Sequence, residues 1–178
     1  PIGLINDTSQ IIVSSWQTGN YNFALSILNG MPRATIVTSD GKFLDILATN
    51  IKLFPNIWYD IAFSINDTIE NLYLNGSLIA SKHINGFILT NIKDIYIGME
   101  NSTPAQHFNG LIASISIINK FINSPFIYND LINTNEDLIK FFYFLNISSN
   151  NAFIENLTYV KVNNFPWYYY TLNYNFKY

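Results

Sequence analysis

Side chains that could carry acid–base chemistry are few and scattered along the 178-residue chain. The twelve carboxylates come closest together at Asp67 with Glu70 and at Glu136 with Asp137. Two carboxylates at a suitable separation could act as general acid and general base. However, the first pair flanks a predicted hairpin, and the second pair is typical of a solvated helix end. The sequence therefore predicts no catalytic residues and a protein that is not an enzyme.

The sequence also offers little support for a metal site, a cofactor site or a catalytic nucleophile. His83 and His107 stand alone, so no arrangement of serine, histidine and acid can be read from them. The chain has no cysteine, which excludes a disulfide framework and a thiolate metal site. A calcium site would need a dense run of residues with oxygen ligands, and the sequence contains no such run. We predict no metal site and no cofactor.

The amino-acid composition limits the kinds of partner that the protein could bind. The net charge is −3 and Arg33 is the single arginine, so there is no basic stripe for nucleic acid. No apolar run approaches 18 residues, so we predict no transmembrane segment. Only 12% of residues are charged, and 26 asparagines supply much of the polarity instead. Because Pro1 is not a start methionine, we expect a processed product or a fragment.

Six Asn-x-Ser/Thr sequons point to an exterior protein. Several of them fall in predicted turns, where a glycan would be accessible. We therefore predict a glycoprotein located outside the cell or at the cell surface. The predicted glycosylation sites are Asn6, Asn66, Asn75, Asn101, Asn146 and Asn156.

One aromatic run has the chemistry of a sugar site. The stretch "PWYYY", residues 166–170, offers rings that could stack on pyranose faces, with nearby amides for the hydroxyls. Trp167, Tyr168 and Tyr170 are the candidate carbohydrate-binding residues. Strand alternation would bury some of these rings, so a purely structural role competes with this interpretation.

The elements that must position these residues are mainly strands. Residues 57–65 alternate well, and Asn75-Gly76 suits a two-residue turn between strands 70–74 and 77–82. One short helix is expected over 124–132, while residues 136–142 could add a helical turn or open a strand. Further strands are predicted at 10–16, 22–28, 34–38, 43–48, 95–98 and 111–119. Many short strands separated by turns indicate an all-β sandwich or jelly roll.

Five motifs in order resemble the laminin-G-like members of the concanavalin-A-like jelly-roll superfamily. They are "WYDIAFSIND", "LYLNGSLIAS", "IYIGMENS", "FNGLIASISIINK" and "SPFIYNDLI", all within residues 58–132. The resemblance implies an all-β, concanavalin-A-like (laminin-G-like) jelly-roll β-sandwich with one short helix. The Glu-x-Asp-x-x-Glu motif of the glycosidases on this fold is absent.

The order of the elements is rotated relative to that family. Residues 1–135 resemble the later strands, and residues 136–178 resemble the opening strands. We expect one jelly-roll domain over 1–178, with 138–178 lying beside 10–16 and 110–119. Three explanations stay open: a circularly permuted domain, a piece of a tandem array, or C-terminal strands that complete a neighbouring chain.

The resemblance and the composition together suggest a role. The main hypothesis is a non-enzymatic, extracellular structural or adhesive surface protein, either a filament or coat subunit or a repeat of a large adhesin. The alternative is a carbohydrate-binding or receptor-binding module. The expected partners are copies of the same chain, associated into a polymer or tandem array by strand exchange, and glycans.

Overall fold

The computed structural model describes residues 9–17, 20–66, 68–85, 94–101, 106–118, 138–143 and 170–177. These residues form strands in two antiparallel sheets. The first sheet contains β1 (Ser9–Gln17), β2 (Asn20–Leu28), β3 (Met31–Val37), β4 (Phe43–Leu47) and β8 (Tyr96–Ile97). The second contains β5 (Trp58–Ile65), β6 (Ile69–Leu74), β7 (Ser77–His83), β9 (Leu111–Ile118), β10 (Leu138–Tyr143) and β11 (Tyr170–Lys177).

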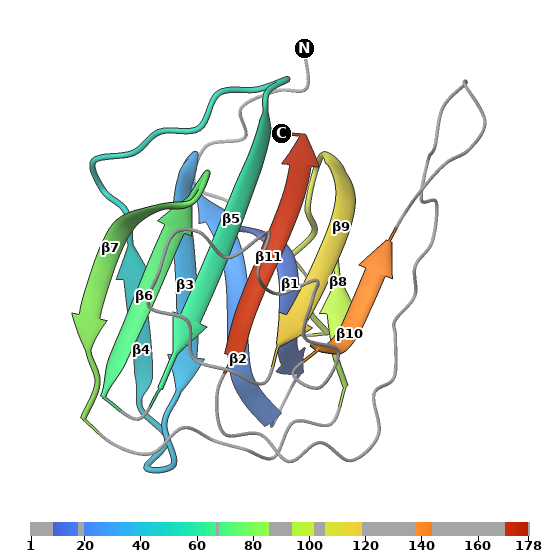
Figure 1. The fold of residues 1–178 in the computed structure, drawn as a ribbon. Helices are drawn as coiled ribbons and strands as arrows, with labels where there is room; N and C mark the ends of the chain where they lie inside the picture. Colours follow the sequence, from blue (N-terminus) through green and yellow to red (C-terminus); the bar gives the residue numbers. More distant parts are fainter. Residues whose placement is uncertain are drawn as a thin grey trace.

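The two sheets stack face to face as a sandwich (Figure 1). The first has the order β4-β3-β2-β1-β8, and the second has the order β10-β9-β11-β5-β6-β7. Strands β4 and β7, each at the end of its sheet, lie at the same edge of the sandwich (Figure 1). This confirms the predicted all-β jelly-roll class, and each strand predicted between residues 10 and 119 is present within a few residues of its expected bounds.

Tight turns set the register of two hairpins. Asn75 and Gly76 have φ values of 49° and 77°, as a type I′ turn requires, and they pair Leu74 with Ser77. Asn29 and Gly30, at 53° and 79°, do the same between β2 and β3. The sequence prediction of a two-residue turn at Asn75-Gly76 is therefore confirmed.

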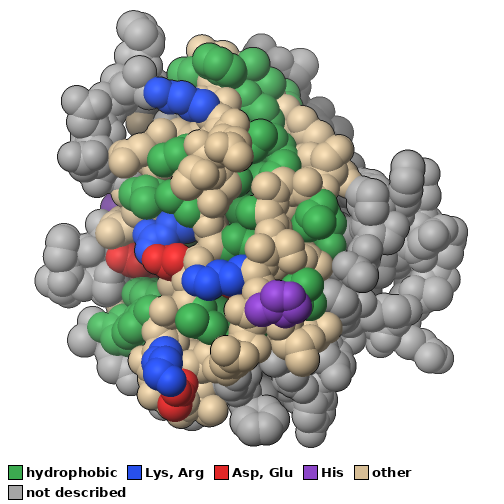
Figure 2. Space-filling model, turned by 90° about the vertical axis from the view of Figure 1, so that its left-hand side faces the viewer, with side chains coloured by type: hydrophobic (Ala, Val, Ile, Leu, Met, Phe, Trp, Pro, Cys, Tyr) green, Lys and Arg blue, Asp and Glu red, His purple; other side chains and the backbone are tan. Residues whose placement is uncertain are grey.

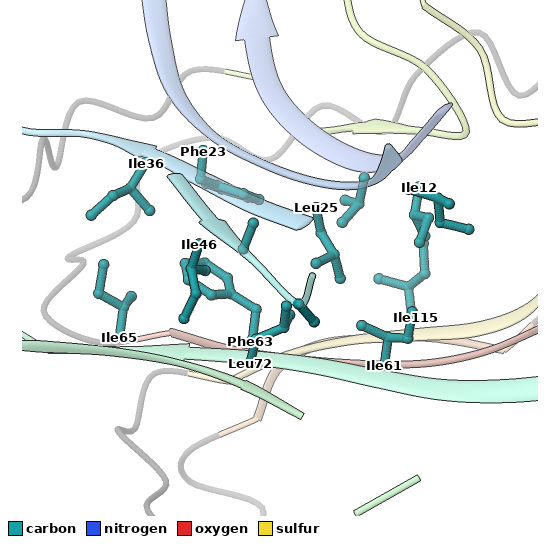
Figure 3. Close-up of a cluster of buried hydrophobic side chains, with 14 of the residues drawn as sticks. Ile12, Phe23, Leu25, Ile36, Ile46, Ile61, Phe63, Ile65, Leu72 and Ile115 are labelled. Carbon is teal, nitrogen blue, oxygen red and sulfur yellow. The ribbon is translucent and has the colours of Figure 1, made fainter. Parts of the chain in front are cut away.

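The core lies between the inner faces of the two sheets. Figure 3 shows side chains of the first sheet pointing toward those of the second sheet across the gap. Ten of these buried side chains are Ile12, Phe23, Leu25, Ile36, Ile46, Ile61, Phe63, Ile65, Leu72 and Ile115. Burial of each side chain of this size stabilises the fold by about 1.5–3 kcal/mol.

The two strands from the C-terminal third lie in the second sheet. β10 pairs with β9, and β11 lies between β9 and β5. Residues 138–143 therefore form a strand and not the alternative helical turn. The described strands of this segment lie beside β9, as expected, while β1 lies in the other sheet next to β2 and β8. Residues 144–169 lie outside the described residues, so the expectation that 138–178 also lies beside 10–16 stays a prediction. The helix predicted over 124–132 lies outside the described residues.

Candidate functional site

A hollow of about 280 Å³ lies on the outer face of the first sheet, away from the core. We call it the sheet groove. It crosses four adjacent strands and reaches the segments around residues 100 and 106. Its lining residues are Ser9, Ile11, Trp16, Ala24, Ser26, Arg33, Thr35, Phe43, Asp45, Glu100 and Gln106.

Strand alternation explains why this face is hollow. In β2 the large side chains Phe23, Leu25 and Ile27 point into the core, so the residues between them point outward. Two of those outward residues, Ala24 and Ser26, are small and form the middle of the groove. Longer side chains on β1, β3 and β4 surround them. Small side chains on the outward face of β2 therefore leave a depression in the outer face of the sheet.

Three aromatic rings cluster at the groove. The ring centroids of Trp16 and Tyr21 are 5.1 Å apart, and Phe43 lies 5.6 Å from Trp16 and 5.9 Å from Tyr21. The three rings come from β1, β2 and β4, and their tilted packing is a favourable aromatic geometry. Phe43 is 56% exposed despite its apolar ring. An exposed ring supported by two others offers a rigid apolar surface to a ligand.

A charged pair lies on the neighbouring strands. Arg33 Nη2 donates to Asp45 Oδ2 at 2.6 Å, and Thr35 Oγ1 donates to Asp45 Oδ1 at 2.5 Å. The side chains of Arg33 and Asp45 are 25% and 45% exposed, so the pair is partly open to solvent at the groove. Both carboxylate oxygens of Asp45 accept hydrogen bonds, so Asp45 orients the Arg33 side chain. The guanidinium carries further N–H donors that a ligand can use.

Backbone hydrogen bonds position the side of the groove that is formed by the segments around residues 100 and 106. Asn101 N donates to the carbonyl of Trp16 at 2.8 Å, and Glu100 N donates to the carbonyl of Gln106 at 3.2 Å. Glu100 is only 6% exposed, while Gln106 is exposed and presents its amide at the groove. These contacts fix the backbone that carries Glu100 and Gln106 beside β1.

Ser9 provides an unused polar group in the same hollow. Its Oγ is buried and has no hydrogen-bond partner among the described residues. A buried hydroxyl without a partner costs free energy, which a ligand with a donor or an acceptor would recover. The groove thus combines aromatic rings, a guanidinium, a carboxylate, an amide and a free hydroxyl.

A second charged cluster lies at the sandwich edge formed by β4 and β7. Basic and acidic side chains adjoin one another in the middle of this edge (Figure 2). Lys82 Nζ donates to the backbone carbonyl of Asp45 at 2.7 Å and so joins the two sheets. Asp45 therefore belongs both to this edge and to the sheet groove.

Glu70 lies behind that edge, inside the sandwich. It lies two residues before the core residue Leu72 on β6 and therefore on the same, inward face. Glu70 is fully buried, and neither carboxyl oxygen has a hydrogen-bond partner among the described residues. Burial raises the pKa of the Glu70 carboxyl from its ordinary value of 4.5 to about 8. The positive charge of Lys82 opposes this rise in the pKa, and the negative charge of Asp45 adds to it.

The carboxylates and histidines considered from the sequence do not form a site in the described residues. Glu70 is buried in the interior, while Asp67, Glu136 and Asp137 lie outside the described residues. His83 and His107 are both exposed, the first on β7 and the second after the 102–105 segment. Within the described ranges, no group of three or more histidine, aspartate or glutamate side chains is arranged to hold a metal ion.

The candidate sugar residues of the C-terminal segment are covered only in part. Trp167 and Tyr168 lie outside the described residues. Tyr170 is the first residue of β11 and pairs in register with Ile65 of β5. Their role in carbohydrate binding therefore stays a prediction.

The asparagines of three of the six sequons are described. Asn66 Oδ1 accepts hydrogen bonds from the Thr68 backbone N–H and hydroxyl. Asn75 and Asn101 are exposed, and Asn101 Nδ2 donates to Tyr96 Oη at 3.0 Å. The sequons at Asn6, Asn146 and Asn156 lie outside the described part of the chain.

Sequence reasoning missed the sheet groove. Trp16 and Phe43 each fall in a predicted strand and Arg33 directly precedes one, but nothing in a single strand pattern shows that they share one face. Only the register of β1 to β4 brings them together. The available signal was the small outward face of β2, where Ala24 and Ser26 alternate with three large apolar residues.

The two stacked antiparallel sheets define a β-sandwich domain of the jelly-roll type. A laminin-G family model, described as the Concanavalin A-like lectin/glucanases superfamily, matches residues 3–127. Because the match covers well over half of the chain, the protein belongs to this superfamily, which confirms the resemblance seen in the motifs. Laminin-G-like domains are generally non-catalytic modules that bind carbohydrates or adhesion partners, and they are often extracellular.

Neither a curated protein nor a solved structure matches the chain. The described part of the chain contains no helix that is long and apolar enough to cross a membrane.

Proposed function

We propose that the protein is a non-enzymatic, extracellular adhesive domain that binds a glycan in the sheet groove. The observation that carries the proposal is the exposed ring of Phe43 beside Trp16, next to the Arg33–Asp45 pair. Sugar rings present an apolar face that packs on aromatic rings and a belt of hydroxyls that both donate and accept hydrogen bonds. The groove supplies both kinds of contact within a single hollow.

The groove also sets the class of glycan. Arg33 is already paired with Asp45, so the groove has little net positive charge with which to attract an anionic sugar. Its volume of about 280 Å³ is at the small end for ligand sites. We expect a neutral mono- or disaccharide unit at the end of a larger glycan. Such weak, repeated contacts suit a surface protein that acts in many copies.

The experiment that tests this proposal is a glycan array followed by calorimetric titration with the strongest neutral hit. Phe43→Ala and Trp16→Ala should each weaken binding about 2- to 12-fold, since one aromatic contact is worth about 0.5–1.5 kcal/mol. Trp58→Ala is the matched control, because Trp58 is 48% exposed but lies on β5 of the other sheet.

Two outcomes would contradict the groove assignment. Equal affinities of the wild type, Phe43→Ala and Trp16→Ala would exclude the groove as the site. A loss of binding confined to Trp167→Ala would place the sugar at the C-terminal aromatic run instead. Circular dichroism of each variant would show that the substitution leaves the fold intact.

A structural role in a filament, coat or adhesin array remains compatible with glycan binding. The exposed sequon asparagines Asn75 and Asn101 support an exterior location, because a glycan attached to either would be accessible to solvent. Assembly into such an array requires contacts between copies, and a separate feature of the fold bears on this.

A further inference from the structure

The strand β11 occupies the middle of the second sheet. It pairs antiparallel with β5 from Tyr170 opposite Ile65 to Lys177 opposite Trp58. On its other side it pairs antiparallel with β9, from Thr171 opposite Ile118 to Lys177 opposite Leu111. β11 is thus the strand that joins β9 and β10 to β5, β6 and β7.

A sheet without β11 would be split in two. Both β5 and β9 would present a full row of unpaired backbone N–H and C=O groups to the gap. The gap also lies next to the core, because Ile61 on β5 and Ile115 on β9 are fully buried. The two strands therefore form a slot that fits one antiparallel strand with the register of β11.

The connection to β11 is long enough to reach another molecule. Residues 144–169 separate the end of β10 from the start of β11. A chain of 26 residues spans up to about 85 Å when extended, several times the length of β11 itself. The covalent chain therefore permits β11 to enter the slot of a second copy as well as its own.

The strand pairs are the same whichever chain provides β11. Exchange therefore leaves the hydrogen bonds of the sheet unchanged. Its free-energy cost comes only from the connection 144–169 and from the entropy of association. The chain carries a net charge of −3 over 178 residues, so electrostatic repulsion between copies is weak. Nothing in the pairing opposes exchange at high local concentration.

We propose that β11 is an exchange strand, and that the β5–β9 slot of one chain accepts β11 from a second copy. The partner is thus another molecule of the same protein, and repeated exchange links copies into an array. This inference rests on the sheet pairing, the length of the connection to β11 and the low net charge, and it is independent of the glycan groove.

Cysteine cross-linking tests the exchange directly, because the chain contains no cysteine. Thr171 and Ser64 are opposite one another in the β11–β5 register. Ser64→Cys and Thr171→Cys are made in separate chains, mixed in equal amounts, unfolded, refolded together at high concentration and oxidised. Complete exchange should link about half of the chains as dimers, since each slot then receives either variant with equal chance.

Controls exclude random oxidation. Ser64→Cys mixed with Lys177→Cys should give far less dimer, because Lys177 lies opposite Trp58 at the far end of β5. The double variant Ser64→Cys/Thr171→Cys in one chain shows whether the register exists at all. Ala62→Cys with Asn173→Cys repeats the test at a second register pair.

The proposal is overturned if the double variant forms its internal disulfide while the mixed single variants yield no more dimer than the off-register control. That result would mean that β11 stays in its own chain. A double variant that forms no disulfide at either register pair would also overturn the proposal, because β11 would then not occupy the β5–β9 slot.

Discussion

Replacement of Glu70 by glutamine should remove most of the pH dependence of stability between pH 4.5 and 8. The carboxyl group is fully buried and has no hydrogen-bond partner among the described residues, and its pKa rises from 4.5 to about 8 because burial disfavours the charged form. Between these two pH values the folded chain keeps a proton that the unfolded chain has released. The free energy of unfolding therefore falls as the pH rises through this window.

The magnitude follows from the two pKa values. At 1.36 kcal/mol for each pH unit, a rise from 4.5 to about 8 corresponds to about 5 kcal/mol between acidic and alkaline limits. This is a large fraction of the roughly 5–15 kcal/mol that stabilises a typical domain. The wild-type protein should thus be markedly more stable at pH 5 than at pH 8.5.

Urea unfolding at pH 5, 6, 7 and 8.5 measures this slope. Glu70→Gln should flatten it and should exceed the wild type in stability at pH 8.5. Asp40→Asn is the matched control, because hydrogen bonds from Lys42 and Thr38 lower the pKa of exposed Asp40 to about 2, far below this window. Equal stability of the wild type at pH 5 and pH 8.5, or an unchanged slope in Glu70→Gln, would refute the reasoning.

Three further predictions test the fold and its surface. Leu72→Ala should lower the free energy of unfolding by about 2–5 kcal/mol in urea titrations, because Leu72 is fully buried in the core; a loss below 1 kcal/mol would contradict this. Gly76→Ala should cost about 1 kcal/mol, since Gly76 has a φ of 77°, whereas the neighbouring Ser77→Ala should be nearly neutral. Intact-mass spectrometry of native material should show glycans on at least two sequons, and the bare 20.4 kDa chain would argue against them.

The hairpin of β6 and β7 was predictable because its signals are local. Asn75-Gly76 favours positive φ at both positions, and the alternation before it fixes which side chains point inward. The same holds for residues 57–65, in which Tyr59, Ile61 and Phe63 share the core face. Ile57 is an exception, since it precedes β5 and is exposed.

The sheet groove and the environment of Glu70 were not predictable because both depend on distant parts of the chain. The groove requires β1 and β4 to present Trp16 and Phe43 on one face, which local patterns do not determine. The two-residue spacing from Leu72 places Glu70 on the core face of β6, but a carboxylate near a hairpin is usually solvated. Only the packing of β4 and β7 against each other shows that this edge is closed.

The most direct test of glycan binding in the sheet groove uses the three tryptophans of the chain, Trp16, Trp58 and Trp167. Each gives one indole N–H signal in an amide-proton NMR spectrum, and a Trp→Phe variant assigns each signal. Titration with the neutral glycan should shift the Trp16 signal and leave that of Trp58 in place. A shift confined to Trp58 or Trp167, or no shift at all with a glycan that binds, would contradict the account.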